Sequence, residues 1–265
     1  VLVEPLKRAM DRGVEEGVES FEALWAIYDE EVNSTADVLR DFKNKTYEYQ
    51  HLVWPEMVTS FCMHGPLDVG RDVTDMRAVD YNYTSVNVLG VPNVSDSLFA
   101  LKRAVFEEGR FTLAEVRDAM KHDWQGSEEM RQYLLNLPKF GNDLDAPDAM
   151  ATEVSEHVRE VLERRRNIKG FCFRPSLFQF MGHTYAGPIL GATPDGRTSS
   201  EPLAHGMNPM HGRNTEGISA TAQSFCKLDF TRYQGGSFQI ELDPSFFPAG
   251  LPRSTYVQAF ALSFF

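Results

Sequence analysis

The chain has 265 residues, a length that fits one large domain or two small ones. A formal net charge of −12 opposes binding to a phosphate backbone, so no nucleic-acid partner is expected. The sequence is 42% hydrophobic, enough for a core, but no apolar run approaches the roughly 20 residues that cross a bilayer, so no membrane segment is expected.

Three widely spaced cysteines form neither a disulfide framework nor a C-x-x-C metal pair, which fits a reducing, cytoplasmic setting. Each is expected to behave as a small buried hydrophobe. The opening VLVEPLKRAMDRG carries charge too early for a signal peptide. The chain begins without Met and closes on the apolar run STYVQAFALSFF, so we expect it to be a piece of a longer protein.

A long helix is predicted for residues 20–50. Apolar side chains from Phe21 to Val32 recur at spacings of three and four, and Ser20 stands where the first turn needs a cap. The apolar residues of 52–64 predict that a helical layer continues there. Residues 65–93 are broken by Gly, Pro, Asp and Asn, which predicts a long irregular loop.

Four further helices are predicted, at residues 95–108, 113–122, 127–137 and 146–167. Ser95 or Asp96 is expected to cap the first, and Thr112 with Glu115 matches a capping box for the second. The last is acidic early and ends in the basic run 164–166, which complements the helix dipole. We therefore interpret this arginine run as a solvated helix end and not as a phosphate clamp.

Strand patterns follow these helices. Residues 171–183, FCFRPSLFQFMGH, read as a buried strand, and residues 235–244, GGSFQIELDP, alternate apolar and polar side chains like a second one. Along the first strand, Phe178 and Phe180 should share one face while Leu177, Gln179 and Met181 share the other. The order of elements predicts an α/β or α+β body that is helix-rich in its first two thirds.

Residues 191–198, GATPDGRT, differ by one residue from the phosphate-loop pattern G-x-x-x-x-G-K-[ST]. Pro194 removes a backbone donor, and Asp195 places negative charge where phosphates would sit. The segment that follows contains Pro202 and cannot form the required helix. We therefore reject a nucleotide site.

The same residues have a different interpretation. T-P-D-G predicts a type I turn, with Pro at its second position and Gly at its fourth. Arg197 is then expected to be tethered to a nearby carboxylate, that of Asp195 or Glu201.

Several motifs occur together in a recognisable order. The longest motif is GATPDGRTSSEPLAHGMNPMHGRNTEG, and after it come SFCKLD and GGSF. Before it, in chain order, come RDVTD, GVPNVSDSLFALKRAVFEE, RQYLLNLPKFGND and FRPSLFQF. From about residue 15 to 265 the chain resembles the glycyl radical enzymes, the family that includes pyruvate formate-lyase and radical dehydratases and decarboxylases. NPMHGR is similar to pyruvate formate-lyase, whereas the longer block 93–143 is similar to the dehydratase, decarboxylase and lyase branch.

The resemblance implies a fold and a chemistry. The fold would be part of a ten-stranded α/β barrel built from two half-barrels, so residues 1–265 would form a single partial domain. In this family a Cys loop and a Gly loop meet inside the barrel, and the glycyl radical draws hydrogen from the Cys, whose thiyl then attacks substrate. Such chemistry needs a sealed interior and close placement of the groups.

Neither catalytic loop is recognisable in this chain. Cys62, Cys172 and Cys226 lie in SFCMHG, GFCFRP and SFCKLD, none of which has the family's G-C-x-E form. No string resembles the R-V-x-G-Y loop of the radical Gly. We expect the Cys loop before Val1 and the Gly loop after Phe265, so no catalytic residue is expected in this chain, which should be inactive on its own.

The resemblance places the strand at 173–183 beside the barrel cavity, and the substrate-pocket candidates are Arg174, Phe178, Phe180 and His183. Arg174 suits an anionic substrate group, and His183 suits acid–base chemistry; the alternatives are a structural ion pair for Arg174 and a hydrogen-bonded strand end for His183. The family-motif residues with an expected structural role are Gly191, Thr193, Pro194, Asp195, Gly196, Arg197, Glu201 and Pro202.

TSSEPLAHG departs from the family's commoner A-G-E-P-L-A-D-G and puts His205 where Asp is usual. His205 and His211 lie in Gly-rich turns without a third ligand beside them, so no metal site is expected.

The implied function of the whole protein is radical cleavage of a C–O, C–N, C–S or C–C bond in a small organic substrate. The alternatives are formate C-acetyltransferase activity and a catalytically inert, divergent homologue. No directly bound cofactor is implied. The partners would be a small-molecule substrate and an activating enzyme that uses S-adenosylmethionine and a [4Fe-4S] cluster to install the radical, and the protein would be a cytoplasmic homodimer.

Overall fold

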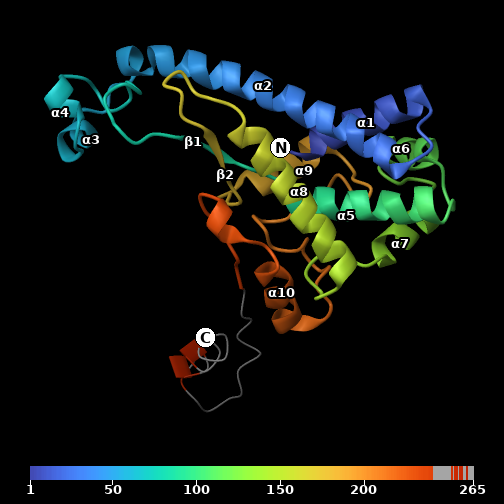
Figure 1. Ribbon diagram of the computed structural model, residues 1–265. Helices are drawn as coiled ribbons and strands as arrows, with labels where there is room; N and C mark the ends of the chain where they lie inside the picture. Colours follow the sequence, from blue (N-terminus) through green and yellow to red (C-terminus); the bar gives the residue numbers. More distant parts are fainter. Residues whose placement is uncertain (241–251, 253, 256, 259–260, 262–265) are drawn as a thin grey trace.

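The computed structural model describes residues 1–240, 252, 254–255, 257–258 and 261. Its body is made of helices packed in pairs around one hydrophobic core. Helix α1 (Val3–Glu16) lies along the first half of α2 (Phe21–Val53), and α5 (Val91–Leu101) packs against α8 (Asp145–Glu163) (Figure 1). No helix in the described part of the chain is long and apolar enough to cross a membrane.

The predicted long helix is confirmed as α2. The Ser20 side chain accepts a hydrogen bond from the Ala23 amide at 3.1 Å, as a cap should. Leu24, Tyr28 and Val32 are buried, because spacings of four keep them on one face. At its other end α2 runs beyond the body, so its last turns have no core to contact (Figure 1).

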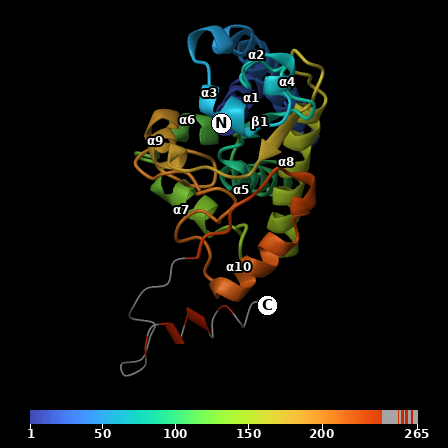
Figure 2. The same cartoon turned by 90° about the vertical axis from the view of Figure 1, so that its left-hand side faces the viewer.

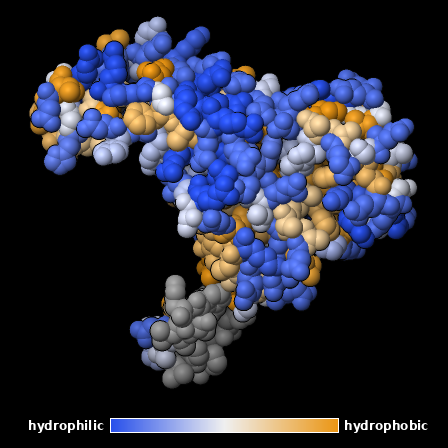
Figure 3. All heavy atoms as spheres, in the orientation of Figure 1, coloured by the Kyte–Doolittle hydropathy of each residue, from blue (hydrophilic) through white to orange (hydrophobic). Residues whose placement is uncertain are grey.

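A lobe made of the end of α2, α3 (Met57–Cys62) and α4 (Pro66–Val69) stands apart from the body in Figure 1, and in Figure 2 it faces the viewer. The prediction of further helix in 52–64 is confirmed by α3. Its apolar side chains are exposed, however, and Figure 3 shows apolar surface on this lobe. Hydrophobic periodicity predicted the helices without indicating which surface would cover them.

The expectation of a long irregular stretch at 65–93 is wrong in three places, the last of which is the start of α5 at Val91. It contains α4 and the strand β1 (Thr84–Asn87), which pairs in parallel with β2 (Phe173–Ser176) in the register Thr84 to Phe173. Strand β1 is only four residues long, too short for alternation to identify it. The described part of the chain is thus a helix-rich α/β structure with a two-stranded parallel sheet.

Helix α5 begins earlier than predicted. Gly90, with φ of 87°, occupies the cap position, and Val91 and Pro92 form the first turn. Ser95 and Asp96 therefore lie inside the helix and are buried, so neither is a cap. The helix continues as a π-helical turn, η1 (Lys102–Glu107), and the left-handed Gly109 follows its end.

The next three predicted helices are present. They are α6 (Leu113–Lys121), α7 (Glu128–Asn136) and α8, which ends at Glu163 and not at residue 167. Arg164 and Arg166 are exposed as predicted, but Arg165 is buried. Its guanidinium donates to the Asn33 carbonyl at 2.7 Å and to Asp37 at 3.1 Å, so it joins α8 to α2.

The capping box of α6 gives a direct stability test. Thr112 Oγ1 accepts from the Glu115 amide at 3.2 Å, and the Glu115 carboxylate accepts from the Thr112 amide at 2.7 Å. Thr112→Ala is expected to lower the free energy of unfolding by about 1 kcal/mol, measured by urea denaturation. Thr112→Ser keeps the hydroxyl and should retain most of this stability. Equal losses of stability in the two variants would contradict a capping role.

The predicted strand 171–183 is much shorter in the structure. β2 covers Phe173–Ser176, and the chain turns into α9 (Gly182–Leu190). In the predicted strand 235–244, residues 235–240 contribute only a bridge between Gly236 and Leu177, and residues 241–244 lie outside the described residues. Helix α10 (Gly217–Cys226) and the short helix η2 (Phe230–Arg232) precede that segment.

Candidate functional site

The T-P-D-G turn is present and lies at the centre of the fold. The Gly196 amide donates to the Thr193 carbonyl at 3.0 Å, which closes the predicted turn. Thr193, Asp195 and Arg197 are completely buried. The Asp195 carboxylate accepts from the Thr193 hydroxyl and from Asn93 Nδ2 of α5, the latter at 3.3 Å.

Arg197 is tethered, but not to a carboxylate as we expected. Its guanidinium donates to three main-chain carbonyls, those of Gly191, Thr198 (3.0 Å) and Glu201 (2.5 Å), and its Nε donates to Thr193 Oγ1 at 3.2 Å. The carboxylates of Asp195 and Glu201 instead accept hydrogen bonds from the two threonines beside them. Burial lowers the pKa of Arg197.

Other helices are joined to this turn through its main chain. Trp124 Nε1 donates to the Arg197 carbonyl at 3.0 Å, and Arg131 Nε of α7 donates to the Gly196 carbonyl at 2.9 Å. The Asp123 carboxylate accepts from the amide and the hydroxyl of Ser199, both at 2.7 Å. The turn therefore connects helices and leaves no concave set of amides for a phosphate.

The E-P-L part of the motif packs directly on α9. A Cβ added to Gly187 would collide with the carbonyl oxygen of Glu201 and would lie 2.9 Å from Cα of Pro202. The Glu201 carboxylate accepts from the Thr198 amide at 2.8 Å. This contact fixes the loop 198–202 against the helix that carries His183.

The four substrate-pocket candidates follow one another along β2 and into α9. Arg174 lies in β2, is exposed and stacks over the ring of Tyr83 at 5.8 Å. Among the described residues it forms no ion pair. Phe178 and Phe180 face outward, with 41% and 78% of their surface exposed.

The alternation predicted for residues 177–180 is confirmed. Leu177 and Gln179 are buried, while Phe178 and Phe180 are exposed. Met181 departs from its predicted face and is exposed, because the chain turns toward α9 at this point.

His183 lies in the first turn of α9 and not at the end of a strand. Its ring meets that of His205 edge to face, with centroids 4.5 Å apart. Burial and the neighbouring His205 lower the pKa of His183. The structure thus joins two histidines that the sequence separates, whereas Arg174 lies elsewhere, beside Tyr83.

The prediction of buried cysteines is wrong. Cys62 and Cys226 are exposed, and Cys172 is half-buried. Cys62 lies on the lobe that extends from the body, and Cys226 ends a helix near the surface, so neither reaches the core. Within the described residues no group of three or more His, Cys, Asp or Glu side chains gathers as a metal site would.

Two neighbouring buried titratable groups, Lys139 and Asp96, were missed by the sequence reasoning. Lys139 Nζ donates to the carbonyls of Leu134 (2.6 Å) and Leu137 (2.8 Å) and is buried near Asp96. Asp96 Oδ1 accepts from the Phe140 amide at 2.8 Å, but its Oδ2 has no partner. The only signal in the sequence was Asp96, a carboxylate directly before the apolar run of α5, and we interpreted this residue as a helix cap.

Burial raises the pKa of Asp96 to about 7, against an ordinary value of 3.8, although Lys139 acts in the opposite direction. Between these two values the folded chain holds a proton that the unfolded chain has released. Stability should therefore fall as pH rises through this window, by up to roughly 1.4 kcal/mol per pH unit. Urea denaturation at several pH values should show this slope in the unchanged protein and in Asp145→Asn, but not in Asp96→Asn. The same slope in all three proteins would contradict the assignment to Asp96.

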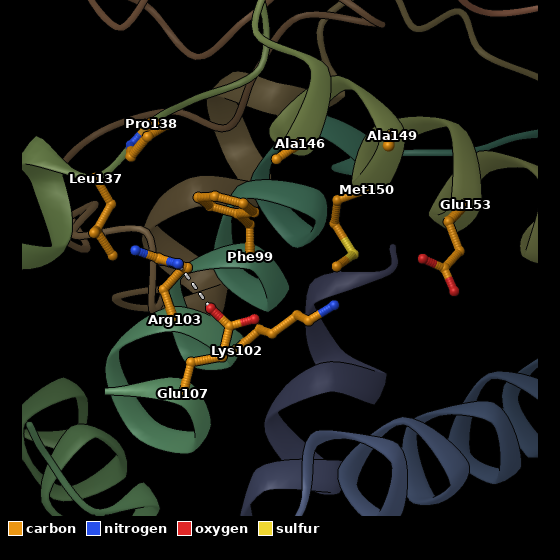
Figure 4. A pocket seen from close by; sticks show the side chains of 10 residues that line it. All are labelled: Phe99, Lys102, Arg103, Glu107, Leu137, Pro138, Ala146, Ala149, Met150 and Glu153. Atoms are coloured by element: carbon orange, nitrogen blue, oxygen red, sulfur yellow. Dashed lines mark hydrogen bonds and ion pairs between the residues drawn. The ribbon is translucent and has the colours of Figure 1, made fainter. Parts of the chain in front are cut away.

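A groove of about 490 Å³ lies between the end of α5, η1, and the start of α8 (Figure 4). Phe99, Leu137 and Met150 line its apolar part, and charged side chains such as Lys102 and Glu153 surround them. None of the sequence-predicted candidates lines this groove, so it is separate from the pocket proposed along β2 and α9.

Comparison with known proteins identifies the fold. Residues 9–187 match the family model described as pyruvate formate lyase-like. The trans-4-hydroxy-L-proline dehydratase of Clostridioides difficile is 26% identical over 88% of this chain and 30% of its own length. A Roseburia inulinivorans structure concerned with 1,2-propanediol dehydration superposes with a TM-score of 0.88, at 26% identity over 98% of this chain and 35% of its own.

A glycyl radical enzyme from Archaeoglobus fulgidus also superposes, with a TM-score of 0.79 and 27% identity over 87% of this chain and 31% of its own. The expected resemblance is thereby confirmed, and the chain spans about 30% of the length of the curated relatives it matches. With a family model matched over more than half of its residues, the chain belongs to the pyruvate formate lyase-like family.

Proposed function

We propose that this chain is the part of a glycyl radical enzyme that lies between its two catalytic loops, and that the whole protein cleaves a C–O, C–N, C–S or C–C bond in a small organic substrate. The observation that carries the proposal is the family match over residues 9–187, followed directly by the completely buried motif turn at 193–197. Relatives that act as dehydratases favour C–O cleavage among these reactions.

Within that protein the chain would supply one wall of a ten-stranded barrel, with the parallel pair β1–β2 as part of it. Arg174, Phe178, Phe180 and His183 would face the substrate. The exposed phenylalanines support this role, since they present apolar surface that a closed radical site needs to exclude water. Arg197 and its turn would hold the loops in place and take no part in the chemistry.

The remaining parts of the proposal concern partners. A radical S-adenosylmethionine enzyme with a [4Fe-4S] cluster would install the radical on a Gly outside residues 1–265, and no cofactor would bind this chain directly. The whole protein would be a cytoplasmic homodimer. These expectations rest on membership of the family and on the dehydratase relatives.

The proposal is tested by electron paramagnetic resonance under anaerobic conditions. The full-length protein, incubated with its activating enzyme, S-adenosylmethionine and a reductant, is expected to give a glycyl radical doublet. The 265-residue chain treated identically should give none. A doublet from the isolated chain would contradict the placement of the radical Gly, and a silent full-length protein would favour an inert homologue.

Formate C-acetyltransferase remains the second candidate because of NPMHGR at residues 208–213. Incubation of the activated protein with pyruvate and coenzyme A would give formate only if this alternative holds.

A further inference from the structure

Unpartnered polar atoms gather where α9 begins. The described residues contain buried side-chain nitrogen and oxygen atoms without a hydrogen-bond partner, and four of these atoms come from one neighbourhood: Gln179 Oε1, His183 Nδ1, His205 Nδ1 and Ser237 Oγ. Gln179 Nε2 donates to the Ala204 carbonyl at 2.8 Å, which brings residue 179 beside residue 205. Buried polar atoms are normally paired, so this concentration makes the start of α9 a candidate binding site.

The outer nitrogens of both histidines are already engaged. His205 Nε2 lies 3.3 Å from the Phe180 carbonyl, which can only accept, so this ring carries its proton on Nε2 and leaves a lone pair on Nδ1. His183 Nε2 lies 3.3 Å from Thr184 Oγ1. A metal-binding histidine is usually held in this way, with one ring nitrogen hydrogen-bonded and the other free for the ion.

The spacing of the rings fits a shared ion. Two imidazole nitrogens that each lie about 2.1 Å from one ion, in neighbouring coordination positions, place their ring centroids about 4–5 Å apart. The centroids of His183 and His205 are 4.5 Å apart, and their planes are inclined by 70°. Both side chains are partly buried, and their Nδ1 atoms lie below the surface.

The available ligands select the class of ion. Within the described residues neither His183 nor His205 forms an ion pair with a carboxylate, unlike His157, which pairs with Asp29. Hard cations such as Mg²⁺ and Ca²⁺ need carboxylates, whereas Ni²⁺, Cu²⁺ and Zn²⁺ bind neutral imidazole. Gln179 Nε2 donates to the Ala204 carbonyl, so Gln179 Oε1 is left as an unpartnered acceptor.

We propose that His183 and His205, with Gln179 Oε1, form a binding site for a divalent transition-metal ion such as Ni²⁺ at the start of α9. Water would complete the coordination sphere. The ion would tie Gly182–His183 to the turn at 204–206. The sequence expectation of no metal considered only the near neighbours of His205, whereas His183 lies 22 residues earlier in the chain and comes close only in the fold.

The test is a calorimetric titration of the tag-free 265-residue chain with NiCl₂. Cys62 and Cys226 are exposed thiols that bind the same ions, so the parent protein should carry serine at both positions. One Ni²⁺ per chain is expected. His205→Asn and His183→Asn should each weaken binding by at least about tenfold, while His211→Asn, which changes an exposed histidine in another turn, should leave it unchanged.

Thermal unfolding gives a second readout. Ni²⁺ should raise the midpoint of the parent protein and of His211→Asn, and it should not raise that of His183→Asn or His205→Asn. Circular dichroism establishes that each variant is folded. The proposal would be overturned if the parent bound no Ni²⁺, or if the parent and the three variants bound it with equal affinity. Ordered water would then be the partner of the four polar atoms.

Discussion

Replacement of Arg197 by methionine is expected to lower the free energy of unfolding by about 3–5 kcal/mol, the largest loss predicted for a single substitution in this chain. The guanidinium is completely buried and donates to the carbonyls of Gly191, Thr198 and Glu201. Methionine fills much of the volume but removes the guanidinium donor from all three carbonyls, of which that of Thr198 keeps only the Glu201 amide at 3.3 Å. It also leaves Asp195 buried with less compensating charge.

Urea denaturation of the unchanged protein and of Arg197→Met measures this loss in the free energy of unfolding. Arg40→Met is the matched control. In the described part of the chain Arg40 pairs with Asp37 and Asp41 at the surface, and such pairs are worth about 0–1 kcal/mol. If Arg197→Met does not fold, Arg197→Lys is the milder variant. It keeps a charge but cannot reach three carbonyls from a planar fork, so it should still be clearly destabilised. Equal losses for Arg197→Met and Arg40→Met would show that the buried network has little effect on stability.

Gly187→Ala is expected to destabilise the fold by about 1–3 kcal/mol, although alanine is the better helix former. In an open helix this exchange would favour folding by roughly 0.5–1 kcal/mol. At Gly187 the new Cβ would collide with the Glu201 carbonyl, and moving that carbonyl would disturb its hydrogen bond from Arg197. The steric cost therefore exceeds the helix gain.

Gly182→Ala is the control within the same helix. A Cβ at Gly182 would meet only ordinary contacts, 3.6 Å from Gln179 Oε1 and 3.7 Å from the Leu89 side chain. Gly182→Ala should therefore be neutral or slightly stabilising in the same denaturation experiment. Stabilisation by both substitutions would mean that the loop 198–202 does not press on α9 as the structure shows.

The helices that could be predicted are those whose signals are local. A cap, a capping box and a spacing of three or four residues lie within a few positions of one another, as at Ser20 and at Thr112–Glu115. The strands were predicted poorly, because β1 and β2 pair across almost 90 residues and each is four residues long. The start of α5 was misplaced because a buried aspartate at residue 96 looks, in sequence, like a cap.

By itself the sequence determined the T-P-D-G turn, the rejection of a phosphate loop and the family, since these depend on adjacent residues and on the order of motifs. Only the tertiary structure decided the partners of the polar side chains. Arg197 binds carbonyls from the end of α9 and from the turn at 198–201, and His183 meets His205 because α9 folds back over the loop after it. Side-chain partners far apart in sequence are chosen by packing and by desolvation, and neither is encoded in local spacing.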